Sequence, residues 1–414
     1  MDNLYNNIEV CFVTTTQYQL LLSDIYSRYL SDYYGIKPIV LHRRFKNFDI
    51  TKFNTEEKYK IVPYTIRNKN ILGQCMFALQ CGYLFPFSKW NRLLDRNKRI
   101  ILFMYVDTSK LSSRMIELVK SFNPYNKVFL IDEGTATYMD KLEKKNERLW
   151  YLKHRISKIL FGYGRTSEVI GDNPLIDGAI VREPENYKKL KKAKKQTVLR
   201  QSADILQYSG QFIAHYSKED FGTLECDVLY LGQSYYRHGR YYEPEIDCIR
   251  LLLSAIPLTA KVLIKPHPRD VDHKYDGLMK DNLHIIGGDV ATFPIESLLT
   301  LTNPRVVVTI QSSAAITLAD MFPEIKCIIL KHIPDVQCFI KQLKETGEEV
   351  PEFDDAFFDA KNKNVYCPNS LEEFSLLITK LLEDKSKGYL YSASKKAKFH
   401  EIDEIILQTI ENQK

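Results

Sequence analysis

Short runs of β-branched and other apolar residues alternate with longer amphipathic segments along most of this 414-residue chain. Apolar runs of about four to eight residues are typical of buried strands, and longer segments with a period of about 3.6 residues are typical of helices. This alternation favours a parallel sheet with helices on both faces. Because the chain is too long for one ordinary core, we expect two doubly wound α/β domains.

The expected strands fall into two series. They lie at residues 8–13, 38–41, 99–106 and 128–131 in the first half, and at 227–231, 262–264, 283–286, 306–310 and 327–330 in the second. The pattern predicts an N-terminal domain over residues 1–187, a basic linker region over 188–225, a C-terminal domain over 226–392, and a last helical segment over 393–414 that could pack back on the first domain.

The linker expectation rests on residues 188–195, which hold six lysines in eight positions. Such a run lacks an apolar face of useful width, so a solvated linker is the first interpretation. A contact with anionic lipid is the alternative.

Composition restricts the partners. The net charge is +6, which is too small to argue for nucleic-acid binding but suits an anionic substrate or an acidic membrane face. The 26 tyrosines and 21 phenylalanines offer surface for stacking on sugars or bases. We therefore expect a small anionic ligand and no nucleic acid.

Cysteine spacing and hydropathy bear on the compartment. The eight cysteines form no CxxC pair, so we expect reduced thiols and no zinc site. No secretory signal is recognisable, and no apolar stretch approaches the ~20 residues that a membrane span needs. The expected location is cytoplasmic, with peripheral contact at the cytoplasmic face of an inner membrane left open.

A short polar motif follows an expected strand in four places. The motifs are Asp132-Glu133-Gly134, Gly232-Gln233, Lys265-Pro266-His267-Pro268 and Ser312-Ser313. In open α/β sheets the carboxyl ends of the strands line the ligand crevice. We therefore interpret the motifs as parts of one nucleotide-dependent active site.

Two motifs carry titratable groups. A carboxylate of Asp132 or Glu133 near a hydroxyl can act as a general base, although a plain strand–helix turn is the simpler alternative. His267 lies between two prolines that stiffen the backbone, and as an imidazolium it could donate a proton to a phosphate. The alternative is a rigid loop whose histidine bonds to the backbone.

The remaining motifs suit binding. Ser312 and Ser313 begin an expected helix, where hydroxyls and free N–H groups form a phosphate cradle or an ordinary N-cap. Gly232 permits close approach to a ligand, and Gln233 can bond to a base edge or sugar. Glu296 opens another helix and could accept hydrogen bonds from ribose hydroxyls, or only complement the helix dipole.

Neither of two common nucleotide-binding motifs is found in a convincing place in the sequence. No GxxxxGK[ST] loop is present, and no DxD motif stands in a convincing place. We therefore expect neither a P-loop triphosphate site nor a bound metal ion.

Taken together, the four motifs and the stretch at residues 13–19 resemble the bacterial sialyltransferases, including the lipooligosaccharide sialyltransferases and capsular polysialyltransferases. The resemblance spans residues 13–313 with the motifs in the same order. It implies the GT-B architecture, with two Rossmann-like domains facing a central cleft. It also implies inverting, metal-independent transfer of sialic acid from CMP-sialic acid to a hydroxyl of a surface glycan, either lipooligosaccharide or capsule.

The resemblance also implies roles for individual residues. Glu133 or Asp132 would be the general base, and His267 the general acid at the departing phosphate. The donor would be bound by Gly134, Gly232, Gln233, Lys265, Pro268, Glu296, Ser312 and Ser313. We favour Glu133 as the base because Asp132 extends the strand pairing. Glu243 and Glu245, in a loop after the first strand of the second half, remain alternatives.

Other functions stay open at this point. The donor could be another CMP-activated acid sugar, of the Kdo or legionaminic type, or a UDP-sugar bound by an epimerase-like fold. A non-catalytic module that binds a polyanionic polymer for an export system is a third possibility, motivated by the lysine run and the positive charge.

Overall fold

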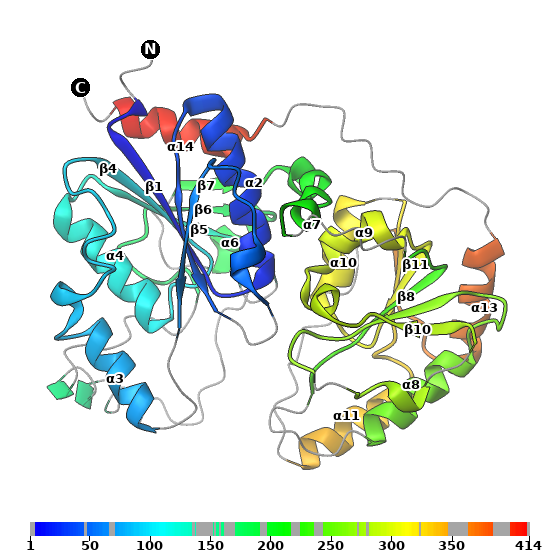
Figure 1. Cartoon of the computed structure of the whole chain (residues 1–414). Coiled ribbons are helices and arrows are strands. Elements are labelled where there is room, and N and C mark those ends of the chain that lie inside the picture. The colour runs from blue at the N-terminus through cyan, green and yellow to red at the C-terminus, as the bar shows by residue number, and fades with distance from the viewer. Residues whose placement is uncertain are drawn as a thin grey trace. The chain divides into compact units, whose positions relative to one another are not determined.

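The computed structural model describes residues 5–44, 48–65, 71–134, 137, 152, 155–156, 159–160, 170–190, 197–216, 224–235, 243–270, 273–278, 281–322, 324–346, 363–383 and 398–411. The chain forms two compact units (Figure 1). Unit 1 comprises residues 1–216 and 395–414, and unit 2 comprises residues 217–394. Each unit is built on a parallel sheet flanked by helices, which confirms the predicted pair of Rossmann-like α/β domains.

The described strands of unit 1 form a parallel sheet in the order β3-β2-β1-β4-β5-β6-β7. They are β1 (Ile8–Thr14), β2 (Ile39–Arg43), β3 (Lys60–Tyr64), β4 (Arg99–Met104), β5 (Lys127–Ile131), β6 (Gly178–Val181) and β7 (Thr197–Arg200). The central strands β1, β4 and β5 are almost wholly buried, which explains why they read as continuous apolar runs rather than alternating ones.

Helices and short 3₁₀ segments connect these strands. They are α2 (Gln17–Tyr34), α3 (Ile71–Cys81), α4 (Lys110–Phe122), α6 (Pro184–Leu190), α7 (Gln211–Tyr216), α14 (His400–Glu411), η1 (Ile50–Lys52), η2 (Phe85–Phe87) and η4 (Ala203–Tyr208). Helix α2 begins where the Thr16 hydroxyl accepts a hydrogen bond from the Gln19 N–H at 3.2 Å. It ends at Gly35, whose φ of 66° is left-handed and favours glycine.

The C-terminal helix α14 packs on α2 of unit 1. The Tyr26 hydroxyl donates to Glu401 at 3.0 Å, and the Tyr29 hydroxyl donates to Asp403 at 2.7 Å. The ring of Phe399 meets the rings of both tyrosines edge-on. The chain therefore returns to the first sheet after completing the second.

The described strands of unit 2 form a parallel sheet in the order β10-β9-β8-β11-β12-β13. The strands are β8 (Val228–Leu231), β9 (Val262–Lys265), β10 (Leu283–Ile285), β11 (Val306–Thr309), β12 (Lys326–Ile329) and β13 (Val365–Tyr366). The helical segments are α8 (Glu243–Ser254), α9 (Ile295–Thr302), α10 (Ser313–Met321), α11 (Pro334–Glu345), α13 (Leu371–Glu383), η5 (Asp276–Leu278) and η6 (Asp289–Thr292).

One buried cluster of unit 2 lies on the face of the sheet that α8, α11 and α13 cover. Side chains of β8, β9, β11 and β12 pack there against buried residues of α8, α11 and α13. Helix α10 contacts β11 and β12, and Figure 1 shows α9 and α10 on the face opposite α8 and α11. The helices thus leave the edge at the carboxyl ends of the strands to the connecting loops.

The structure corrects the predicted basic linker over residues 188–225. Residues 184–190 form α6, and β7 pairs in parallel with β6, so this stretch belongs to unit 1 up to residue 216. The lysine run dominated the local composition, and β7 is only four residues long, too short to register against it. Residues 191–196, which hold most of that run, lie outside the described residues.

Two further strands of unit 1 escaped the sequence pattern. Strand β3 was not predicted, and β6 lies in a stretch that showed little periodicity. Within the described ranges, no helix combines the length and the hydropathy needed to cross a bilayer.

Candidate functional site

The sheet of unit 2 brings three of the four motifs to one edge. Strand β8 lies between β9 and β11, with Leu231 in register with both Lys265 and Thr309. The residues that follow these positions therefore leave the sheet side by side. The Gly232 N–H donates to the Lys265 carbonyl at 2.9 Å, and the Gln233 side-chain N–H donates to the Gln311 carbonyl.

His267 begins a tight turn. The Asp270 N–H donates to the His267 carbonyl at 2.8 Å, which places Pro268 at the second turn position, where proline is favoured. The Asp270 carboxylate accepts from the His267 N–H at 3.0 Å. The Arg269 N–H donates to Nδ1 of the His267 ring at 3.1 Å. Because Nδ1 is an acceptor here, the neutral ring carries its proton on Nε2.

The surroundings of His267 disfavour its charged form. Burial, together with the positive charges of Arg269, Lys265 and Lys274, lowers the pKa of His267 to about 3. The ring is therefore neutral in the free protein, whereas the sequence suggested an imidazolium. A phosphate beside it would act in the opposite direction, since a neighbouring anion favours the protonated ring.

Lys265 supplies a buried cation next to this turn. It is only 6% exposed, and its Nζ donates to the carbonyls of Pro266 at 3.3 Å and Ala291 at 3.2 Å. Burial lowers the pKa of Lys265 to about 8, against the opposing negative charges of Glu296 and Asp270. Glu296 is itself buried in the first turn of α9. The structure thus places Glu296 near the ammonium of Lys265.

The serine pair divides into two positions at the start of α10. Ser312 is the N-cap, and its hydroxyl accepts from the Ala314 N–H at 3.3 Å. Ser313 is the first residue of the helix and is half-buried. Both hydroxyls lie at the positive end of the helix dipole, where an anion is favoured.

Gly232 and Gln233 have packing roles of their own. A Cβ at Gly232 would meet the Tyr275 hydroxyl and would lie 3.2 Å from the Lys265 carbonyl. The side-chain oxygen of Gln233 accepts from the Tyr235 hydroxyl, while its amide reaches the Gln311 carbonyl. Gln233 therefore ties the loop after β8 to the loop after β11.

The acidic motif lies in unit 1, at the carboxyl end of β5. Asp132 is 1% exposed; its N–H continues the sheet by donating to the Ile180 carbonyl at 2.9 Å. Its carboxylate accepts from Arg182 Nε at 3.1 Å and from the Gly134 N–H at 2.8 Å. Gly134 has a φ of 140°, a conformation that other residues rarely adopt.

Glu133 has a different environment. It is half-buried, and its carboxylate accepts a hydrogen bond from the side-chain N–H of Gln19. The Gln19 side-chain oxygen accepts in turn from the Thr15 hydroxyl at 3.0 Å. Sequence reasoning assigned no role to Gln19 or Arg182. The stretch at residues 13–19, which already resembled the sialyltransferases, was the available signal for Gln19.

The two alternative acids are not in a loop, which corrects the sequence interpretation. Glu243 and Glu245 form the first turn of α8. Glu243 is exposed, whereas Glu245 is fully buried and pairs with Lys274 Nζ at 2.6 Å. Burial raises the pKa of Glu245 to about 7. Glu245 is therefore a buried ion-pair partner.

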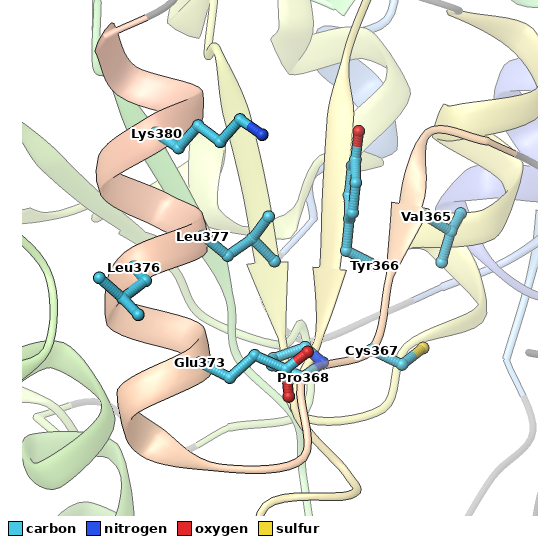
Figure 2. A pocket seen from close by; sticks show the side chains of 8 residues that line it. All are labelled: Val365, Tyr366, Cys367, Pro368, Glu373, Leu376, Leu377 and Lys380. Atoms are coloured by element: carbon cyan, nitrogen blue, oxygen red, sulfur yellow. The ribbon is translucent and has the colours of Figure 1, made fainter.

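A cavity of about 480 Å³ lies between β13 and α13 and holds none of the predicted site residues. Figure 2 shows Leu377 and Lys380 of α13 on the side of the helix that faces Tyr366. In the described part of the chain, no three His, Cys, Asp or Glu side chains are grouped so that they could bind a metal ion.

The chain was compared with known protein sequences and with solved structures. A comparison with curated protein sequences gives no match. Among solved structures, the chain is similar to a Listeria monocytogenes protein assigned as a UDP-N-acetylglucosamine 2-epimerase. The identity is 9%, the coverage is 93% of this chain and 92% of that chain, and the TM-score is 0.51. This likeness supports the fold.

A second similar structure is the GT-B domain of a sialyltransferase from Photobacterium damselae, at 12% identity, with 87% of this chain and 99% of that chain covered and a TM-score of 0.46. The family model described as alpha-2,8-polysialyltransferase (POLYST) matches residues 11–331, which is more than half of the chain. The chain therefore belongs to the alpha-2,8-polysialyltransferase family and is a sialyltransferase of the glycosyltransferase class.

Proposed function

We propose that this sialyltransferase uses CMP-sialic acid as its donor and transfers the sugar, with inversion, to a hydroxyl of a sialylated surface glycan. The observation that carries the proposal is the convergence of Gly232, Lys265, His267 and Ser312 on one edge of the unit 2 sheet. Family membership supports a sialic acid acceptor, because an α2,8-polysialyl chain grows on its own terminal residue.

The donor phosphate is the ligand that best suits this edge. Lys265 contributes a positive charge, and the start of α10 contributes the Ser313 hydroxyl at the positive end of the helix dipole. In its neutral form His267 carries a proton on Nε2, which is a hydrogen-bond donor for a phosphate oxygen. As negative charge accumulates on the leaving phosphate oxygen, this hydrogen bond from Nε2 becomes charge-assisted and stabilises the departing CMP.

The chemistry of the step follows from these groups. The acceptor hydroxyl loses its proton to Glu133 while its oxygen bonds to the anomeric carbon of sialic acid. The bond from that carbon to the phosphate oxygen breaks, and CMP departs with the electron pair. Attack opposite the departing group inverts the anomeric centre. The leaving group carries one phosphate, so we infer that Lys265 and the α10 donors stabilise it without a metal ion.

The test is a transfer assay with purified protein. The donors are CMP-sialic acid and CMP-Kdo, and the acceptors are a labelled oligosialoside and a labelled galactoside, each with EDTA or Mg²⁺. We expect CMP release and elongation of the oligosialoside with CMP-sialic acid, unchanged by EDTA. The His267→Gln variant is expected to lose at least about 10²-fold in kcat.

The arms of this assay separate the parts of the proposal. Transfer with CMP-Kdo alone would replace the donor, and activity that requires Mg²⁺ would refute metal independence. Failure to release CMP with either donor and either acceptor would refute the proposed reaction.

A further inference from the structure

A buried group of charged residues lies directly behind the His267 turn. We call it the Lys274 cluster; it consists of Lys274, Glu245, Asp270 and Tyr275. The Lys274 side chain has no exposed surface, and its Nζ lies 2.6 Å from Glu245 and 3.1 Å from Asp270. The Tyr275 hydroxyl donates to Asp270 at 2.9 Å. The cluster thus combines one cation and two carboxylates in the interior of unit 2.

The cluster connects the two loops that carry the His267 and Gln233 motifs. Lys274 Nζ donates to the backbone carbonyl of Gln233 at 2.7 Å. Asp270, the partner of Lys274, accepts the backbone N–H of His267 at 3.0 Å through its other oxygen. A single ammonium group therefore joins the loop after β8 to the turn after β9.

The position of Tyr275 explains a constraint on the same loop. Its hydroxyl occupies the place that a Cβ at Gly232 would need. The same hydroxyl bonds to Asp270 Oδ2, the oxygen that also accepts the His267 N–H. Gly232 and His267 are thus connected through one tyrosine and one carboxylate.

Burying charged residues in a core has a high desolvation cost. The attraction between buried ions must offset the free energy of hydration that they lose. Apolar side chains of similar volume often stabilise a fold as well or better. What charged groups add is directional hydrogen bonding with fixed geometry. Lys274 bonds to both carboxylates of the cluster, and Lys274 and Asp270 also bond to backbone groups of the motif loops.

We propose that the Lys274 cluster is a positioning device, which fixes the Gln233 loop relative to the His267 turn and keeps the proton of the neutral His267 ring on Nε2. Asp270 is the central residue, because it closes the turn in which the Arg269 N–H occupies Nδ1. None of the four residues is assigned contact with the donor. The inference rests on the proposed function, because it gives the positioned imidazole its role.

The test measures His267 directly and independently of activity. In protein labelled with ¹⁵N-histidine, the nitrogen shifts of His267, identified by their loss in His267→Gln, report which ring nitrogen carries the proton. We expect a single Nε2–H form in the wild type. Asp270→Asn removes the charge that pairs with Lys274, and Tyr275→Phe removes one hydrogen bond to Asp270; we expect mixed tautomers in Asp270→Asn and a smaller shift in Tyr275→Phe.

Kinetics supply the second measurement. A displacement of about 1 Å at a reacting group costs on the order of 10²-fold in rate. We expect kcat to fall about 10- to 100-fold in Asp270→Asn, and less in Tyr275→Phe, while the KM for the donor changes by less than about threefold. Lys341→Met, which removes an exposed lysine of α11 in the same unit, is the matched control and is expected to change neither measurement.

The outcomes separate the two proposals. Wild-type tautomer and wild-type kcat in both variants would overturn the positioning role. A changed tautomer in Asp270→Asn, found in a protein that releases no CMP from any donor, would support the positioning role and reject the proposed function. If Asp270→Asn does not fold, as judged by circular dichroism, Tyr275→Phe decides, because it leaves all three charges of the cluster in place.

Discussion

Gln19 donates its side-chain N–H to the carboxylate of Glu133, across 114 positions of the sequence. The adjacent carboxylate of Asp132 is instead buried against Arg182. Two neighbouring acids thus have separate partners, one a neutral amide and the other a guanidinium. We therefore keep Glu133 as the proposed proton acceptor and infer a structural role for Asp132.

Glu133→Gln is expected to lower kcat by about 10²- to 10⁴-fold, the usual contribution of one positioned general base. Glutamine keeps the size of the side chain, so the thermal midpoint should stay close to that of the wild type. Transfer rates and circular dichroism melting curves check the two expectations. A variant with wild-type kcat would remove Glu133 from the mechanism.

Asp132→Asn should mainly lower stability, whereas Glu133→Gln should mainly lower kcat. Removing the charge breaks the buried ion pair between Asp132 and Arg182, and breaking such a pair typically costs about 3 to 5 kcal/mol. We therefore expect a clear loss in the free energy of unfolding, measured by urea denaturation, with a smaller loss of kcat in the protein that remains folded. Equal stability of Asp132→Asn and the wild type would contradict the structural role.

The lowered pKa of His267 predicts that the free energy of unfolding falls at acid pH. The pKa of His267 is lowered from 6.5 to about 3, so between these values the unfolded chain binds a proton there that the folded chain does not. Stability from this group is present above pH 6.5 and is lost as the pH falls through that window, with a limiting slope of about 1.4 kcal/mol per pH unit. His267→Gln removes the group and should flatten the dependence.

The measurement is a series of urea titrations between pH 3 and pH 7. His284→Gln, which changes an exposed histidine of β10 in the same unit, is the control and should keep the wild-type slope. If His267→Gln and His284→Gln follow the same curve as the wild type, the imidazole of His267 is not shielded in the folded state.

Most of the fold could be predicted from the sequence because the patterns that indicate its strands and helices are local. Strand β1 was expected at residues 8–13 and is found at Ile8–Thr14, since a continuous β-branched run is recognisable without its neighbours. Strand β7 was missed for the opposite reason: its four residues become a strand only by pairing with β6. A short run beside six lysines gives no local indication of that partner.

The site shows the same division. Proximity of the Gly232, His267 and Ser312 motifs followed from the rule that strand ends share an edge, and the register of β8 with β9 and β11 bears it out. The sequence could not show that Glu245 is buried against Lys274, because the two residues are 29 positions apart and only the fold brings them together. The partner of a buried charge is determined by the tertiary structure and cannot be predicted from local sequence.

Substitution of the two serines at the start of α10 should have different effects. Ser312→Ala removes the N-cap bond to the Ala314 N–H and is expected to cost about 0.5 to 2 kcal/mol in the free energy of unfolding. Ser313→Ala removes only a hydroxyl of the first helical residue, so its stability should change little. If that hydroxyl binds the donor phosphate, the KM for CMP-sialic acid should rise in Ser313→Ala by about 10-fold. Urea titrations and donor titrations distinguish the two.

The last prediction concerns alkaline pH and Lys265, whose pKa is lowered from 10.5 to about 8 by burial. Above pH 8 the folded protein progressively loses this ammonium, so donor affinity should fall and the KM for CMP-sialic acid should rise. The unfolded chain still binds that proton up to about pH 10.5, so the contribution of Lys265 to the free energy of unfolding should increase over the same interval. Affinity and stability are thus expected to move in opposite directions.

Lys265→Met tests both trends at once. With no ammonium to lose, its KM should be higher than that of the wild type at pH 7 and nearly constant up to pH 9, and its stability should lack the alkaline increase. Lys261→Met changes an exposed lysine just before β9 and should reproduce both wild-type trends. A wild-type KM that stays constant through pH 9, or a stability profile shared by Lys265→Met and Lys261→Met, would show that the ammonium of Lys265 does not bind the donor in the way inferred from its burial.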